Sequence, residues 1–206
     1  MGAKPASFHI FVLLFALGIP IGLIYDALLG FYGQIFAYPD VSNVPVFLLL
    51  NSFFSYGSAL CAAWLLPCTS ARHPANRARV IGSLVLLLLI VTAAWLYAGA
   101  SSLVRVFLVG TAIIVVGELT ALARGLLGPV FAITKGTMAP FACLMTWSIV
   151  IGVIYEGANF LFPLWQWNLD STIPMWIVEL LVIAFGYFVL IHPMFVLSRT
   201  MFGDPR

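Results

Sequence analysis

Residues 79–123 read RVIGSLVLLLLIVTAAWLYAGASSLVRVFLVGTAIIVVGELTALA, two long apolar runs separated by the small residues Gly99 to Ser102. A bilayer core about 30 Å thick needs about 20 residues of helix, and lipid cannot satisfy bare backbone groups, so each run is expected to be a membrane-spanning helix. Because the connection is so short, the two helices are expected to form an antiparallel hairpin. The rest of the chain repeats this pattern of apolar run and short loop.

The composition indicates a membrane protein throughout. Of the 206 residues, 63% are hydrophobic and 8% are charged, which leaves too few polar side chains to cover a surface that faces water. We therefore expect an all-α, polytopic membrane protein. The net charge of +2 is small and the basic residues are scattered among the loops, so nucleic acid is not expected as a partner.

Six apolar runs are long enough to cross a membrane. The first is too long for the hydrophobic part of a signal peptide, and no clear small-residue cleavage site follows it, so we expect it to be retained. No connection has the length of a soluble domain. The chain is predicted to be a single six-helix transmembrane domain, 1–206, with approximate spans 8–31, 44–66, 79–98, 103–123, 138–162 and 174–197.

The basic residues predict which way the bundle faces. With six crossings, one side carries Lys4, Arg72, Arg77, Arg79, Arg124, Lys135, Arg199 and Arg206. The other side carries only Asp40, Asp170 and, just inside a helix, Arg105. The positive-inside rule then places both termini in the cytoplasm. The membrane is expected to be the plasma membrane if the source is bacterial and the endoplasmic reticulum if it is eukaryotic. Trp165, Trp167 and Trp176 are expected at the outer interface.

The three cysteines, Cys61, Cys68 and Cys143, show no CxxC spacing. Cys61 and Cys68 lie seven residues apart on one helix face, too far along the helix axis for a disulfide. We expect the cysteines to be small packing residues. Acylation of Cys68, which lies close to a basic loop, is the alternative.

A layer of polar side chains beneath the outer interface is the candidate ligand site, and it comprises Asp26, Asn51, Tyr155, Glu156, Asn159 and Glu179. At a rise of ~1.5 Å per residue, the acids and amides lie roughly 5 to 11 Å below the interface. Carboxyl groups are unfavourable inside a membrane, so we expect a polar pocket for a lipid headgroup, a cation or a proton. Alternatively, each acid reaches interfacial water or is protonated and hydrogen-bonded across helices, with Tyr25, Tyr56 and Tyr155 as partners.

On the inner side, Glu118 lies in the fourth span, and His9 and His192 lie near the inner ends of the first and sixth spans. We expect interfacial histidines with satisfied hydrogen bonds. Haem ligation by the two histidines is an alternative that nothing else in the sequence supports. Zinc-protease, hydrolase and nucleotide-binding motifs are missing from the sequence, so no catalytic residue, metal or cofactor is predicted.

Three short stretches follow one another in a distinctive order. The first span is followed by Phe36-Ala37-Tyr38-Pro39-Asp40-Val41. The second ends in Leu65-Leu66-Pro67-Cys68 with Arg72-His73 just after, and the fourth ends at Arg124 before the loop Gly125 to Gly128. This order resembles the Insig (insulin-induced gene) family, whose members carry a proline-aspartate-valine loop after span one and a proline-cysteine, then arginine-histidine stretch after span two.

The resemblance implies a six-span, non-enzymatic protein that binds a sterol or another hydrophobic lipid, such as a diacyl lipid, in a cavity within its bundle. In the animal proteins an aspartate tied to the regulation of sterol-sensing-domain partners directly precedes the arginine of span four. Ala123 stands there in this chain, so such partners are not expected. Small residues such as Gly18 and Gly22 are expected to let helices pack closely, and they permit a homo-oligomer. The alternative function is a small transporter or membrane enzyme that uses Asp26, Glu156 and Glu179.

Overall fold

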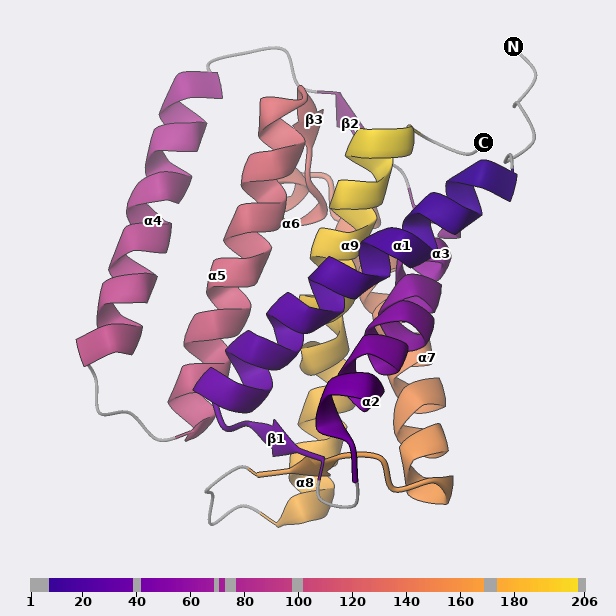
Figure 1. Ribbon diagram of the computed structural model, residues 1–206. Coiled ribbons are helices and arrows are strands. Elements are labelled where there is room, and N and C mark those ends of the chain that lie inside the picture. The colour runs from indigo at the N-terminus through magenta and orange to yellow at the C-terminus, as the bar shows by residue number, and fades with distance from the viewer. Residues whose placement is uncertain are drawn as a thin grey trace.

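A computed structural model describes residues 8–38, 42–68, 71–72, 77–97, 102–168 and 174–203. These residues form a bundle of apolar helices (Figure 1), which confirms the predicted all-α class. Five stretches within them are long and apolar enough to cross a membrane: Phe8–Phe31, Val44–Leu65, Val104–Ala123, Ala139–Leu161 and Met175–Phe202. The predicted span 79–98 falls on a further helix whose apolar part, Ile81–Leu96, is shorter. Lys4, the loop 39–41, His73, Asp170 and Arg206 lie outside the described residues.

Three of the helical rods change from α-helix to π-helix along their length. The first rod is α1 (Phe8–Tyr25) followed by η1 (Asp26–Tyr32). The second is α2 (Val44–Asn51), η2 (Ser52–Tyr56) and α3 (Gly57–Leu65), and the last is α8 (Met175–Leu181), η3 (Val182–Gly186) and α9 (Tyr187–Phe202). The other helices are α4 (Arg77–Tyr97), α5 (Ser102–Ala123), α7 (Ala139–Leu161) and the short α6 (Pro129–Ile133). Short π-helical segments are rare and frequently lie at functional sites.

α9 lies at the centre of the bundle. α3, α5 and α7 pack against it, α1 packs across α3 and η2, and α4 packs along α5 at one edge (Figure 1). α1 begins and α9 ends at the same end of the bundle. The largest fully buried apolar side chains come from these central contacts: Leu14, Leu60, Trp64, Leu144, Ile191, Met194 and Phe195.

The outward faces of the helices are themselves apolar. Leu89 on α4, Phe107 on α5 and Ile154 on α7 are all more than half exposed. Contiguous exposed apolar surface is typical of a face that contacts lipid or a partner. This agrees with an integral membrane protein.

α1 lies close to the second rod because glycine removes the side chains between them. A Cβ atom on Gly18 would overlap the backbone of Gly57, and one on Gly22 would lie 2.6 Å from the Ser52 Oγ atom. The predicted role of Gly18 and Gly22 in helix packing is therefore confirmed.

Short strand pairs, which the sequence did not predict, join loops at the two ends of the bundle (Figure 1). β1 (Phe36–Ala37) pairs antiparallel with β4 (Gln166–Trp167), with Phe36 opposite Trp167. β2 (Ala71–Arg72) pairs antiparallel with β3 (Leu126–Leu127) at the other end. Each strand pair therefore holds two loops together at one end of the bundle.

The prediction that all three cysteines are packing residues was wrong. A disulfide joins Cys68 to Cys143, with their Cα atoms 5.7 Å apart. It links the loop after α3 to the first turns of α7, and it leaves no thiol on Cys68 for acylation. Cys61 is buried and free, as a packing residue would be. The sequence separation of 75 between the bonded cysteines hid their proximity, because only the tertiary fold brings the two helix ends together.

The predicted sixth span ends at residue 197, which is too early. α9 continues to Phe202 and buries Arg199, with 5% of the residue exposed. Its Nη2 atom donates to the Leu66 carbonyl oxygen at 2.6 Å. The guanidinium group thus satisfies a carbonyl at the end of α3 that no helix hydrogen bond can reach.

Candidate functional site

A cavity of about 160 Å³ lies at the end of the bundle where β1 pairs with β4. We call it the aromatic cavity, because its wall includes Tyr25, Phe36, Tyr38, Tyr56, Tyr155, Trp165, Trp167 and Tyr187. The Phe36 and Trp167 rings meet edge to face across the strand pair, with centroids 5.9 Å apart. The strand pair therefore contributes two walls of the cavity and holds them together.

The π-helical segments border the aromatic cavity. Leu29 comes from η1, Tyr56 from η2, and Gly186 from η3. A π-helical turn accommodates more residues per turn than an α-helical one, so it changes the direction of the side chains that follow. This is why Asp26, Tyr56 and Tyr187 converge from rods that otherwise run past one another.

Asp26, the first residue of η1, lies behind the cavity wall and is 1% exposed. Its Oδ1 atom accepts hydrogen bonds from the Tyr38 hydroxyl at 3.0 Å and the Tyr56 hydroxyl at 2.9 Å. Its Oδ2 atom has no hydrogen-bond partner among the described residues. Burial, and then the nearby Asp26 carboxyl group, raise the pKa of Tyr38 above its ordinary value. The Tyr38 hydroxyl therefore stays protonated and donates to Asp26.

Glu156 on α7 binds another pair of wall residues. Its Oε1 atom accepts from the Tyr187 hydroxyl at 3.0 Å, and its Oε2 atom accepts from the Trp167 indole nitrogen at 3.5 Å. Like Asp26, it fixes aromatic side chains rather than lining the cavity itself. The two predicted acids thus share one structural role.

Asn51 and Tyr155 line the aromatic cavity directly. The Asn51 amide donates to the Tyr38 hydroxyl at 3.4 Å and accepts from the Ser55 hydroxyl at 2.7 Å. The Tyr155 hydroxyl donates to the Ser55 carbonyl oxygen at 2.8 Å. The structure therefore brings four of the predicted site residues, Asp26, Asn51, Tyr155 and Glu156, to one cavity.

The remaining predicted site residues lie apart from it. Asn159 holds the loop after α7, because its side chain bonds the backbone of Leu164 and Trp165. It therefore positions Trp165 in the cavity wall without lining the cavity. Glu179 on α8 is exposed and does not line the cavity. The aromatic partners Phe36, Trp167 and Tyr187 were missed as site residues, although the tryptophans had been placed at the correct end of the bundle.

A second hollow of about 410 Å³ lies between α1, α4, α5 and α9. We call it the apolar crevice, because its walls are almost entirely hydrocarbon: Ile21, Ile24, Leu28, Val91, Leu108, Val109, Ala112, Ile113, Val116, Pro193, Met194 and Leu197, with Thr92 and Trp95 from α4. Tyr25 borders both the apolar crevice and the aromatic cavity. The two hollows therefore share a wall.

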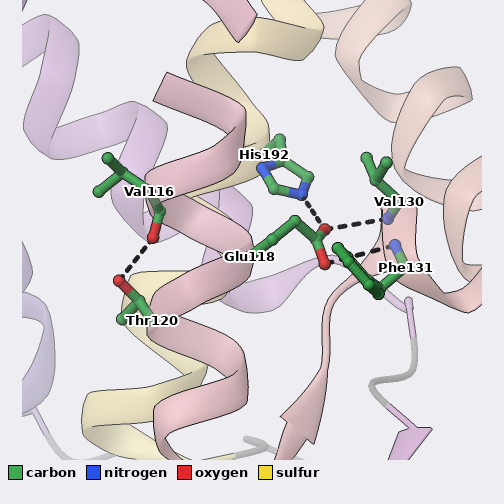
Figure 2. Close-up of polar contacts among 6 residues, drawn as sticks. All are labelled: Val116, Glu118, Thr120, Val130, Phe131 and His192. Atoms are coloured by element: carbon green, nitrogen blue, oxygen red, sulfur yellow. Dashed lines mark hydrogen bonds and ion pairs between the residues drawn. The ribbon is translucent and has the colours of Figure 1, made fainter. Parts of the chain in front are cut away.

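At the other end of the bundle, Glu118 and His192 form a buried pair that the sequence analysis did not predict. The His192 Nε2 atom lies 2.7 Å from the Glu118 Oε1 atom, and both residues are at most 1% exposed. The carboxylate also accepts from the backbone nitrogens of Val130 at 3.0 Å and Phe131 at 3.3 Å (Figure 2). Glu118 thus joins α5 to α9 and to the first turn of α6.

The histidines are not arranged as haem ligands. His9 is exposed at the start of α1, whereas the Nε2 atom of His192 is bonded to Glu118. His192 has the hydrogen bond that was predicted for it, through its Nε2 atom to Glu118, and it is buried where α9 packs against α5 at Gly117. Among the described residues, no group of three histidine, cysteine or acidic side chains is placed to hold a metal ion.

Comparison of the chain with protein-family models, with curated proteins and with solved structures finds no match.

Proposed function

We propose that this protein is a non-enzymatic, six-span membrane protein, with both termini in the cytoplasm, that binds a sterol or another hydrophobic lipid within its helix bundle. The apolar crevice carries this proposal. Its volume of about 410 Å³ falls within the range of about 300 to 1,000 Å³ that is usual for small-molecule sites. Its walls offer hydrocarbon contacts and few polar atoms, which suits an acyl chain or a fused ring system.

The shared wall at Tyr25 supports an amphiphile in particular. The tail of such a ligand occupies the apolar crevice, and its polar end lies toward the aromatic cavity. The Tyr25 hydroxyl donates to the Val189 carbonyl oxygen at 3.2 Å, so its ring is held in place between the two hollows. The resemblance to the Insig family supports the same ligand class.

The sixth crossing is α4, whose full length of 21 residues is enough for a span when its first, basic turn lies at the interface. The membrane is the plasma membrane if the source is bacterial and the endoplasmic reticulum if it is eukaryotic. The small-residue faces permit a homo-oligomer. The transporter or enzyme alternative needs Asp26, Glu156 and Glu179 at one site. Because Asp26 and Glu156 are each bound to tyrosine hydroxyls and Glu179 is exposed, that alternative is not proposed.

The proposal is tested by extracting lipid from the purified protein and by identifying and quantifying that lipid with mass spectrometry. We expect one hydrophobic ligand per chain, displaced by an added oxysterol or diacylglycerol. Recovery of lipid in the proportions of the bulk membrane, with no displacement by either competitor, would contradict the proposal.

A further inference from the structure

The polar hydrogens around the aromatic cavity are directed away from it. The Tyr38 and Tyr56 hydroxyls donate to Asp26, and the Tyr187 hydroxyl donates to Glu156. The Tyr25 and Tyr155 hydroxyls donate to backbone carbonyl groups of Val189 and Ser55. A ligand in the cavity therefore meets aromatic side chains and hydroxyl oxygens, and an anionic ligand would find few donors.

Two carboxyl groups, those of Asp26 and Glu156, lie directly behind this wall. Asp26 and Glu156 each hold aromatic residues of the cavity, and the Oδ2 atom of Asp26 is buried without a hydrogen-bond partner among the described residues. The described residues that line the cavity include no lysine or arginine. A cation bound here would stabilise the ionised form of both acids, because an opposite charge nearby favours the charged state.

The size of the aromatic cavity limits the cation. An engineered cavity of about 150 Å³ holds one benzene molecule, and the aromatic cavity measures about 160 Å³. Choline has about as many heavy atoms as benzene, and its trimethylammonium end presents three methyl groups to its surroundings. Recognition of such groups by aromatic cages through cation–π attraction is well established.

We propose that the aromatic cavity binds a quaternary ammonium group, either the choline headgroup of a membrane lipid or a free choline-like cation. This inference deepens the proposed function, because the headgroup would occupy the aromatic cavity while the acyl chains occupy the apolar crevice. The rings supply cation–π contacts, and Asp26 and Glu156 supply the compensating charge. A neutral group of the same shape would gain only the hydrophobic part of the contact.

The test uses the full-length protein in nanodiscs of phosphatidylglycerol, which lack choline. Isothermal titration with choline is compared with 3,3-dimethylbutan-1-ol, the neutral compound of the same shape. We expect choline to bind about tenfold more tightly. Equal binding of the two compounds, or binding of neither, would overturn the proposal.

The charge contribution is tested with Asp26→Asn and Glu156→Gln, which keep hydrogen-bond acceptors for the tyrosine hydroxyls. Each variant should lose most of the preference for choline while its binding of 3,3-dimethylbutan-1-ol stays unchanged. Full preference in both variants would overturn the proposal. Circular dichroism of each variant verifies that the helices are retained, and the comparison of the two compounds on the unaltered chain needs no variant at all.

The source of the cation is decided by adding phosphatidylcholine to the nanodiscs. Loss of choline binding identifies the lipid headgroup, and unchanged binding identifies a free cation; both support the site. Ala112→Phe, which fills the apolar crevice, should abolish binding of a hydrophobic lipid and leave the choline preference intact. A crevice that binds no lipid and an aromatic cavity that does not prefer choline would therefore give different results.

Discussion

The Glu118 carboxylate on α5 and the His192 imidazole on α9 lie 2.7 Å apart, and both side chains are buried. The same carboxylate accepts two backbone hydrogen bonds from the start of α6 (Figure 2). These three contacts tie Glu118 to α9 and to the first turn of α6, so Glu118 fixes the contact of α5 with α9 and the position of the loop after α5. It is a structural residue at the end of the bundle opposite the aromatic cavity.

Glu118→Ala should destabilise the protein strongly. The substitution leaves His192 and two backbone N–H groups buried without an acceptor, and removal of one partner of a buried pair destabilises a protein by about 3 kcal/mol or more. The free energy of unfolding is measured by titration with sodium dodecyl sulfate, followed by circular dichroism. Glu118→Gln keeps one carbonyl acceptor, so its free energy of unfolding should fall by about half as much. Equal stability of Glu118→Ala and the unaltered chain would contradict this structural role of Glu118.

Gly128 should tolerate no side chain. A Cβ atom there would overlap the Glu118 carboxyl group, so Gly128→Ala should lower the melting temperature in detergent by several degrees. Gly157→Ala is the matched control, because a Cβ atom on that α7 residue would contact nothing within 4 Å. Alanine is a better helix former than glycine by about 1 kcal/mol, so the control should be neutral or slightly stabilising. Similar losses in both variants would show that crowding at Glu118 is not the cause.

The spans could be predicted from the sequence because their signal is local. Apolar runs gave 8–31 and 138–162, and the structure places Phe8–Phe31 and Ala139–Leu161 there. Lipid requires each run to satisfy its own backbone, so length and composition decide the helix. Within a run, the residue pattern does not indicate that α-helix changes to π-helix at Asp26, Ser52 and Val182, because that change depends on packing against other helices.

The depth of a residue within its predicted span was the useful sequence signal for the candidate sites. Counting residues from the outer ends placed Asp26, Asn51 and Glu156 in one layer, and the structure gathers them around one cavity. The same count from the inner ends puts Glu118 and His192 at equal depth, five residues before the predicted ends of their spans. Depth alone could not separate Glu179, which faces outward, because direction around the helix axis depends on neighbours that only the fold specifies.

Reduction of the Cys68–Cys143 disulfide should destabilise the protein. The bond closes a loop of 75 residues, for which the chain-entropy estimate is about 4 kcal/mol. Dithiothreitol should therefore lower the melting temperature of the unaltered chain and of Cys61→Ala alike. Cys68→Ser should melt at the lower temperature and show no further response to the reductant. A full response to dithiothreitol in Cys68→Ser would show that another thiol is responsible.

Six crossings and the predicted orientation can be tested by labelling intact cells with a membrane-impermeant maleimide. The background should be low, because Cys61 is buried and Cys68 is bonded to Cys143. A cysteine at Ala78 or Lys135 should be protected, and one at Gln166 should be labelled. Labelling of Ala78→Cys with protection of Lys135→Cys would mean that α4 and α5 together cross the membrane an odd number of times.

Occupation of the apolar crevice by a hydrophobic lipid is tested most directly by native mass spectrometry of two variants, each of which replaces an alanine by phenylalanine. Ala112 lines the crevice from α5, whereas Ala93 on α4 is exposed and does not line it. We expect the unaltered chain and Ala93→Phe to retain one bound lipid per chain, and Ala112→Phe to lose it while keeping its helical content. Equal lipid retention by Ala112→Phe and Ala93→Phe would contradict the claim.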